Sequence, residues 1–262
     1  MTIASTWLKR ESLSTLMIKL LVYGHKGWIG GQFIKHVMLN TGSASVVLGQ
    51  ARLDNIPDLV SEIEQHQPDS VVCFTGRTHG KIGDKVYSTI DYLEQEGKLV
   101  ENVRDNLFAP ISVANACRER KVHFAYLGTG CIFSYDGEGP GDSFHENSLP
   151  NFTGSGYSTV KGFTDRLMHQ MEDYVLNMRI RMPIVGYDCD RNFITKIKRY
   201  EKVCSMPNSM TVLEDMIPAM LSLIERKITG TINLTNPGYI THNEILELYK
   251  ERVDPNFTWK NF

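Results

Sequence analysis

Tyr157 and Lys161 have side-chain types and a spacing that could transfer a proton. Residues four apart on a helix share one face, and a helix is expected here after the turn 151–156. The lysine charge, with an oxidised nicotinamide nearby, can lower the pKa of the phenol so that it exchanges a proton with a carbonyl or alcohol oxygen. Thr129, at a strand end, stands where a hydroxyl would bind the substrate oxygen. The alternatives are an exposed helix pair and a threonine bonded to its own turn.

The segment KLLVYGHKGWIGG, residues 19–31, predicts a dinucleotide site beside that pair. An apolar strand runs into a G-x-x-G-x-x-G spacing, and glycines let backbone amides and a helix N-terminus approach a pyrophosphate. The spacing favours the extended short-chain dehydrogenase/reductase group, with an ordinary strand-turn-helix as the alternative. The cofactor-binding residues expected in and near this turn are Gly24, Lys26, Gly27, Trp28, Ile29, Gly30 and, after the third strand, Gly76.

The end of the second strand bears on the choice of cofactor. NAD-selective proteins place a carboxylate about twenty residues past the glycines, but residues 46–52 read VVLGQAR and no acid occurs before Asp54. Arg52 could pair with a 2′-phosphate, which favours NADPH. The alternative is that Arg52 is a solvated loop residue.

The elements that must position these residues alternate along the chain. We expect strands at 19–23, 45–48, 70–74, 123–128 and 177–182, and helices at 31–40, 57–66, 100–118 and 158–176. This pattern predicts an α/β fold, a doubly wound Rossmann-like parallel sheet that binds ligands at the carboxyl ends of its strands. Past Pro183 we expect helices 213–226 and 243–251 and a strand 231–235. The predicted domains are an NADP-binding domain over 17–183 and a small C-terminal substrate lobe over 184–262, partly interleaved with it.

Composition limits the classes of protein that this chain can belong to. With 262 residues, 42% hydrophobic and 22% charged, it can bury a large core, and a net charge of −2 gives no case for nucleic acid. No apolar run reaches membrane length. The five cysteines are odd in number and free of C-x-x-C pairs, which argues against disulfides and a metal site and favours the cytoplasm.

Residues 1–16 are expected to be a disordered extension before Met17, with a targeting peptide as the alternative.

Several longer motifs resemble the nucleotide-rhamnose synthase/epimerase-reductase family. They are GHKGWIGG, LGTGCIFSYD, NFTGSGYSTVK, RIRMPI, RNFITKIKRYEKV, PNSMT and NPGYITHNEIL. The resemblance runs from Leu20 to Phe262, and that family is itself similar to bacterial dTDP-4-dehydrorhamnose reductases. It implies an NADPH-dependent conversion of UDP-4-keto-6-deoxy-D-glucose to UDP-L-rhamnose by 3,5-epimerisation and reduction at C4.

The resemblance also assigns roles to two further side chains. In that family a cysteine in T-G-C-I-F and a lysine in R-N-F-I-T-K serve epimerisation, and here they are Cys131 and Lys196. Hydrogens at C3 and C5 flank the C4 ketone, so their removal gives an enolate and needs an acid and a base on opposing sides. A small buried apolar cysteine and a solvated lysine are the alternatives. The expected substrate-binding residues are Thr129, Cys131, Arg191, Asn192, Lys196 and Asn208.

The chain departs from the family pattern at two places. The loop CFTG after the third strand is followed by an unusual stretch from Lys81 to Gly97, and the chain stops at Phe262 where related chains usually continue, which leaves open a truncation. The alternatives are a 4-keto-sugar reductase without epimerase activity and a non-catalytic NADP-binding regulatory subunit. Besides the UDP-sugar, the partners we expect are a second copy of the chain and a 4,6-dehydratase that acts first.

Overall fold

A six-stranded parallel sheet forms the centre of the computed structural model, which describes residues 17–40, 42–135 and 143–262. The strands are β1 (Ile18–Tyr23), β2 (Ala44–Leu48), β3 (Ser70–Cys73), β6 (His123–Thr129), β7 (Val175–Ile180) and β10 (Gly230–Asn233). They pair in the order β10-β7-β6-β3-β1-β2, so the chain winds outward from β1 in both directions. This confirms the doubly wound α/β prediction. The extension expected over 1–16 lies outside the described residues.

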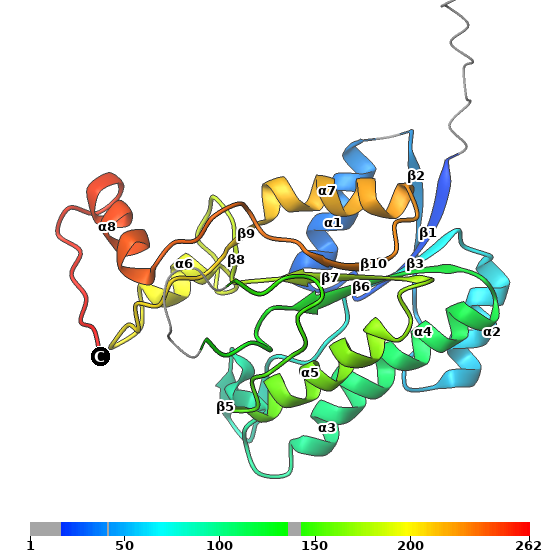
Figure 1. Ribbon diagram of the computed structural model, residues 1–262, viewed down its shortest axis with the longest axis horizontal. Helices are drawn as coiled ribbons and strands as arrows, with labels where there is room; N and C mark the ends of the chain where they lie inside the picture. The colour runs from blue at the N-terminus through cyan, green and yellow to red at the C-terminus, as the bar shows by residue number, and fades with distance from the viewer. Residues whose placement is uncertain (1–16, 41, 136–142) are drawn as a thin grey trace, which may run out of the picture.

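Helices cover both faces of this sheet (Figure 1). One face carries α1 (Trp28–Leu39) and α7 (Leu213–Glu225), and the other carries α2 (Ile56–His66), α3 (Leu99–Val103), α4 (Ala109–Glu119) and α5 (Gly156–His169). The two cores follow from the period of two in β1: Leu20 packs with Phe33 of α1, whereas Leu21 packs with Leu59 of α2. Burial on both faces explains why the strand is apolar throughout.

The boundary between α5 and β7 was predicted wrongly. The expected helix 158–176 ends at His169, and the strand begins at Val175 rather than at residue 177. A turn over 170–174 intervenes, in which the amide of Val175 donates to the carbonyl of Met171. Val175 and Leu176 continue the apolar pattern of the helix, but tertiary packing places them in a fully buried strand.

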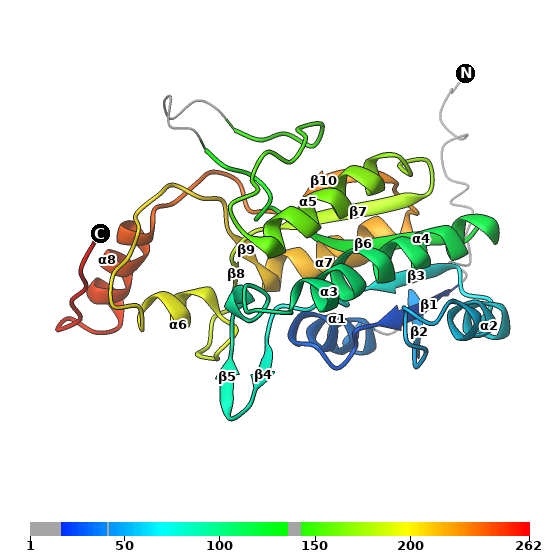
Figure 2. The ribbon, with the colours of Figure 1, turned by 90° about the horizontal axis from the view of Figure 1, so that it is seen from below.

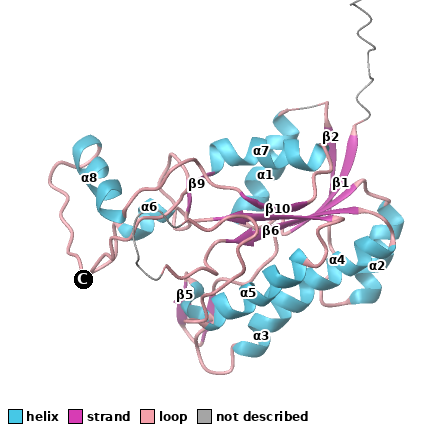
Figure 3. Ribbon diagram, in the orientation of Figure 1, coloured by secondary structure: helices cyan, strands magenta, loops and turns pink. Residues whose placement is uncertain are grey.

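The last third of the chain is shared between the sheet and a C-terminal lobe (Figures 2 and 3). α7 and β10 return to the sheet, while β8 (Pro183–Ile184), α6 (Phe193–Ile197), β9 (Thr211–Val212) and α8 (His242–Arg252) lie beyond its carboxyl edge. The lobe has a small core of its own, formed by Ile197, Val203, Met210, Ile245 and Leu246. Ligands of a doubly wound sheet bind at this edge, so the lobe is placed to cover them.

The unusual stretch after β3 forms a hairpin of β4 (Gly80–Ile82) and β5 (Lys85–Tyr87), followed by a 3₁₀ turn, η1 (Ile90–Tyr92). Figure 2 shows the hairpin projecting from the body of the protein. Within the described ranges, no helix is long and apolar enough to cross a membrane. The same residues contain no group of three or more His, Cys, Asp or Glu side chains that could hold a metal ion.

Candidate active site

The turn between β1 and α1 is built so tightly that side chains would not fit. Gly24 has φ +79°, and a Cβ there would lie 2.7 Å from the carbonyl carbon of Phe74. A Cβ on Gly30 would lie 2.4 Å from the carbonyl oxygen of Gly24. α1 starts after Gly27 with no side-chain cap, which leaves its first amides free to bind an anion. This cradle fits the pyrophosphate of a dinucleotide.

Gly30→Ala should weaken binding of NADPH about tenfold or more, because its methyl group pushes the Gly24 carbonyl out of the cradle. Gly31→Ala is a matched control, since a Cβ there lies 3.5 Å from the nearest atom, an ordinary contact. Fluorescence titration of both variants with NADPH measures the difference. Equal affinities would remove the steric argument for this turn.

Other residues expected to bind the cofactor surround the same turn. Trp28 and Ile29 pack partly buried against the core, and Lys26 is exposed beside them. Gly76 lies in the loop after β3, where its Cβ would come 3.1 Å from Oδ1 of Asn106. Arg52 lies past β2 with its side chain 69% exposed, and its guanidinium donates to both carboxylate oxygens of Asp54 at 3.0 Å. Arg52 is therefore a surface side chain paired with a carboxylate, and its role in cofactor choice stays a prediction.

Tyr157 and Lys161 lie on the first turns of α5, both at least nine-tenths buried, so the exposed-pair alternative is wrong. Ser155 caps this helix, and the carboxylate of Glu94 accepts hydrogen bonds from the amides of Gly156 (2.7 Å) and Tyr157 (3.0 Å). Burial raises the pKa of the Tyr157 phenol, whereas a hydrogen bond with Thr129 opposes that rise. The phenol is thus protonated near neutral pH and can act as an acid.

Lys161 has a partner that the sequence did not reveal. Its Nζ donates to the hydroxyl of Tyr126, which is fully buried on β6, and lies 4.6 Å from the centre of the same ring. Burial lowers the pKa of Lys161 to about 8. The phenolic oxygen of Tyr126 is a neutral acceptor that partly replaces the water lost to the ammonium.

We predict that reduction falls above pH 8, because the charge of Lys161, whose pKa is about 8, stabilises the phenolate that Tyr157 becomes after giving up its proton. Tyr126→Phe removes an acceptor from the charged amine and should move this alkaline limb to lower pH. The pH profile of kcat/KM measures the limb in both proteins. Tyr174→Phe, just before β7 and at the end of the sheet away from the site, should leave the alkaline limb in place. An unmoved limb in Tyr126→Phe would contradict the assignment of the limb to Lys161.

A second group of side chains meets at the carboxyl end of β6. The amide of Cys131 donates to Oγ1 of Thr129 at 3.1 Å, and Cys131 packs against Tyr157. Arg181, after β7, donates to Sγ of Cys131 at 2.8 Å and with two nitrogens to Oδ1 of Asn208, at 3.0 and 2.7 Å. Three of the five predicted catalytic residues, Thr129, Cys131 and Tyr157, are therefore brought together.

Lys196 belongs to a different, cationic group on the lobe. It lies half-buried in α6, where burial and then the charge of Arg191 lower its pKa. His79, before the β4–β5 hairpin, has its pKa lowered by burial and then by Arg191, Arg77 and Lys196. Lys196 is thus partly buried, and its role in epimerisation stays a prediction. Cations gathered in this way suit an anionic part of a substrate.

Two predicted substrate-binding amides are occupied within the protein. Asn192 caps α6 through Oδ1 and donates from Nδ2 to the carbonyls of Val185 and Tyr187. Asn208 uses Oδ1 for Arg181 and Nδ2 for the carbonyl of Met206. Their roles in binding a substrate stay predictions, because each amide already has a structural role.

Asn106 is a site residue that sequence reasoning missed. It lies in a π-helical turn, η2 (Arg104–Phe108), where Oδ1 accepts from the amide of Arg77 at 2.8 Å and Nδ2 donates to the Arg77 carbonyl at 2.9 Å. Its own carbonyl accepts from Thr164 of α5 at 2.6 Å. It thus ties the loop after Gly76 to the helix of Tyr157. The N-x-x-x-N spacing of Asn102 and Asn106 ahead of Pro110 was an available signal.

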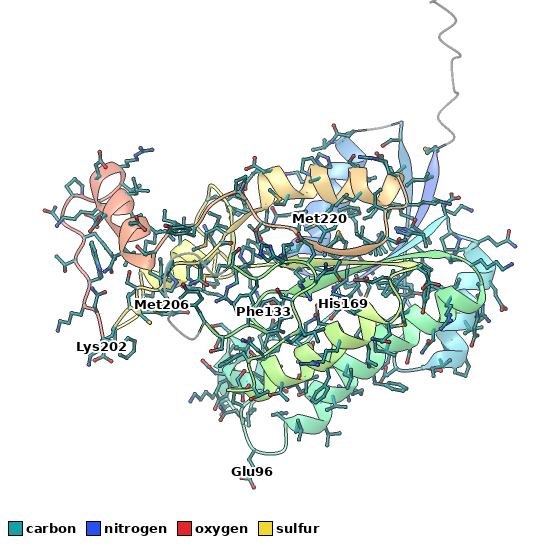
Figure 4. The ribbon with its side chains drawn as sticks, viewed as in Figure 1. Glu96, Phe133, His169, Lys202, Met206 and Met220 are labelled. Atoms are coloured by element: carbon teal, nitrogen blue, oxygen red, sulfur yellow. The ribbon has the colours of Figure 1, made fainter. Side chains whose placement is uncertain are left out.

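The segment between Cys131 and α5 is held by a buried arginine. Arg179 of β7, 1% exposed, pairs with Asp165 and donates to the carbonyls of Glu146 and Ser148. It also donates to His169, and its guanidinium lies 5.1 Å from the ring of Phe133. Figure 4 labels His169 and Phe133, which lie in the middle of the molecule. This network fixes the described part of the segment that passes over the site.

Comparisons with known proteins show which proteins this chain is similar to. The NAD dependent epimerase/dehydratase family matches residues 20–187. Protein L780 of Acanthamoeba polyphaga mimivirus is 51% identical over 246 residues, 93% of this chain and 83% of the relative. A crystal structure of the L780 UDP-rhamnose synthase covers 94% of this chain and 84% of its own, with a TM-score of 0.87.

A plant relative and a bacterial structure extend the likeness. A bifunctional dTDP-4-dehydrorhamnose 3,5-epimerase/dTDP-4-dehydrorhamnose reductase from Arabidopsis thaliana is 40% identical over 253 residues, 95% of this chain and 80% of the relative. The dTDP-4-dehydrorhamnose reductase from Bacillus anthracis, in complex with NADP, has a TM-score of 0.72 over 94% of this chain and 84% of its own. At 16% identity, that structure shows the shared fold.

Proposed function

The chain belongs to the NAD dependent epimerase/dehydratase family, and from that premise we propose that it is an NADPH-dependent enzyme that converts UDP-4-keto-6-deoxy-D-glucose to UDP-L-rhamnose. The observation that carries the proposal is the grouping of Thr129, Cys131 and Tyr157 at the carboxyl end of β6. A reductase needs the tyrosine but not a thiol beside it. The relatives of 51% and 40% identity, one of them a UDP-rhamnose synthase, support the same activity.

The residues present suit each part of this reaction. Cys131, two residues past the end of β6, and Lys196, in α6 of the lobe, would serve as the proton-transferring groups for inversion at C5 and C3, beside the ketone. Thr129 would hold the C4 oxygen, and Tyr157 would give that oxygen a proton while Lys161 stabilises the resulting phenolate. NADPH supplies the hydride to C4 when bound, held by the glycine turn, Lys26, Trp28, Ile29 and Gly76.

The preference for NADPH over NADH rests on Arg52. Its exposed guanidinium lies where the adenosine ribose is expected, and Asp54, its ion-pair partner, is itself 3.7 Å from Arg104. Arg52→Ser should raise the KM for NADPH about tenfold and leave the KM for NADH unchanged. A parallel rise for both cofactors would indicate that Arg52 supports the loop and does not read the 2′-phosphate.

The partners we propose follow from the substrate and from the surface. A 4-keto-6-deoxy sugar must come from a 4,6-dehydratase, and a cytoplasmic location would give access to both NADPH and the nucleotide sugar.

Phe108 and Leu167, each more than 40% exposed, line a hollow of about 400 Å³ between α2, α4 and α5. We propose that a second copy of the chain covers this hollow, and sedimentation of Phe108→Ser should then show a larger monomer fraction than wild type.

Product identification tests the proposed activity. Incubation with NADPH and UDP-4-keto-6-deoxy-D-glucose should consume NADPH and yield UDP-L-rhamnose. Reduced product with the original configuration at C3 and C5 would instead support a 4-keto-sugar reductase. NADPH binding without turnover would support a regulatory subunit.

A further inference from the structure

Arg181 links the two halves of the site. It follows β7, and its guanidinium reaches Cys131 at the carboxyl end of β6 on one side and Asn208 of the lobe on the other. Its backbone amide donates to Oγ1 of Thr211 at 2.9 Å, and Thr211, fully buried, donates in turn to the Leu234 carbonyl. The arginine is thus fixed at both its backbone and its head group.

Asn208 is a rigid partner for this arginine. Its backbone exchanges two hydrogen bonds of 3.0 Å with Ile240, and its Nδ2 is held by the carbonyl of Met206. The amide oxygen is therefore aimed at the guanidinium, where it accepts from both Nε and Nη2. This two-point contact orients the planar guanidinium and leaves its Nη1 directed at the sulfur of Cys131.

No carboxylate of the described residues neutralises the charge of Arg181. Among the residues that the structure describes, Arg181 forms no ion pair, and its side-chain acceptors are an amide oxygen and a thiol sulfur. A cation at hydrogen-bonding distance favours a negatively charged sulfur over a neutral thiol. The other ionisable groups that face this sulfur are Tyr157 and Lys161 of α5. A neutral amide oxygen does not compete for the charge as an acid would.

We propose, on the basis of the proposed function, that Arg181 is a positioning residue that holds the sulfur of Cys131 as a thiolate and so makes Cys131 the base of the epimerisation. The thiolate takes a proton from the carbon next to the C4 ketone. The C–H bond breaks, an S–H bond forms, and the electron pair moves through the carbon skeleton to give an enolate oxygen. The ammonium of Lys196 returns a proton to the opposite face, and water restores both groups.

The test is the rate at which iodoacetamide alkylates Cys131 as a function of pH, followed on the Cys131 peptide by mass spectrometry. Arg181→Met should slow alkylation at pH 7 about tenfold and shift the profile upward by about one pH unit or more. Arg181→Lys should retain part of the rate because it keeps the charge. Asn208→Ala should give an intermediate loss. Arg199→Met, an exposed arginine of the same lobe, is the matched control and should match wild type.

Two outcomes would overturn the role of Arg181. One is an Arg181→Met profile that coincides with wild type, and the other is an Arg181→Lys profile that is as slow as that of Arg181→Met. Because Arg181→Lys keeps the charge and much of the volume, it still tests the proposal if the methionine variant fails to fold. Alkylation needs no substrate, so its result stands even if wild type shows no turnover and the proposed function fails.

Discussion

Tyr157→Phe should reduce the rate of C4 reduction at least about 100-fold while leaving exchange of the C3 and C5 hydrogens with solvent intact. The phenylalanine keeps the ring that packs with Tyr92 and Leu93 but removes the proton that the C4 oxygen needs, and general acid catalysis is worth about 10²–10⁴ in rate. NADPH oxidation measures the reduction, and loss of the C3 and C5 proton signals in heavy water measures the exchange.

Tyr174→Phe is the matched control for this variant. Tyr174 lies before β7, at the edge of the sheet opposite the site, and its hydroxyl has no hydrogen-bond partner among the described residues. It should reduce the substrate at the wild-type rate. If Tyr157→Phe lost exchange and reduction together, the tyrosine would be needed for binding rather than for its proton.

Cys131→Ala should lower the rate of epimerisation about 100-fold or more and still reduce a ketone that is already epimerised. The sulfur lies beside Tyr157 and receives a hydrogen bond from Arg181, whereas alanine offers no group that can take a proton. Two assays separate the steps, namely deuterium incorporation into the 4-keto sugar and NADPH oxidation with the epimerised substrate.

The exposed Cys204 provides the control, since Cys204→Ala removes a thiol of the lobe without touching the site. Equal activity of Cys131→Ala on both substrates would remove Cys131 from the mechanism. Loss of both activities would mean that the thiol supports the site rather than serving one of its two reactions.

Local sequence features were enough to predict the architecture. The glycine turn could be predicted because a positive φ at Gly24 and the contact below Gly30 leave no room for side chains. The apolar strands could be predicted because both faces of the sheet are buried. The end of α5 could not be predicted in this way, because residues 175–176 fit a helix or a strand and packing beside β6 decides between them.

The chemistry of the site depends on contacts between residues far apart in the sequence. Tyr126 and Lys161 are 35 positions apart, and Cys131 and Arg181 are 50 apart. The first pair forms because α5 packs on β6. The second forms because β6 and β7 pair in parallel, so that the residues after their carboxyl ends lie side by side. From the sequence alone, a cysteine can also be an ordinary buried residue and an arginine an ordinary solvated one. Only the fold shows whether either belongs to the site.

The most direct measurement of the central claim is turnover of UDP-4-keto-6-deoxy-D-glucose with NADPH in heavy water, with the product identified and its deuterium located by NMR. We predict UDP-L-rhamnose with deuterium at both C3 and C5, which would place both half-reactions in this chain. A reduced product without deuterium at those carbons would contradict the epimerase assignment of Cys131 and Lys196.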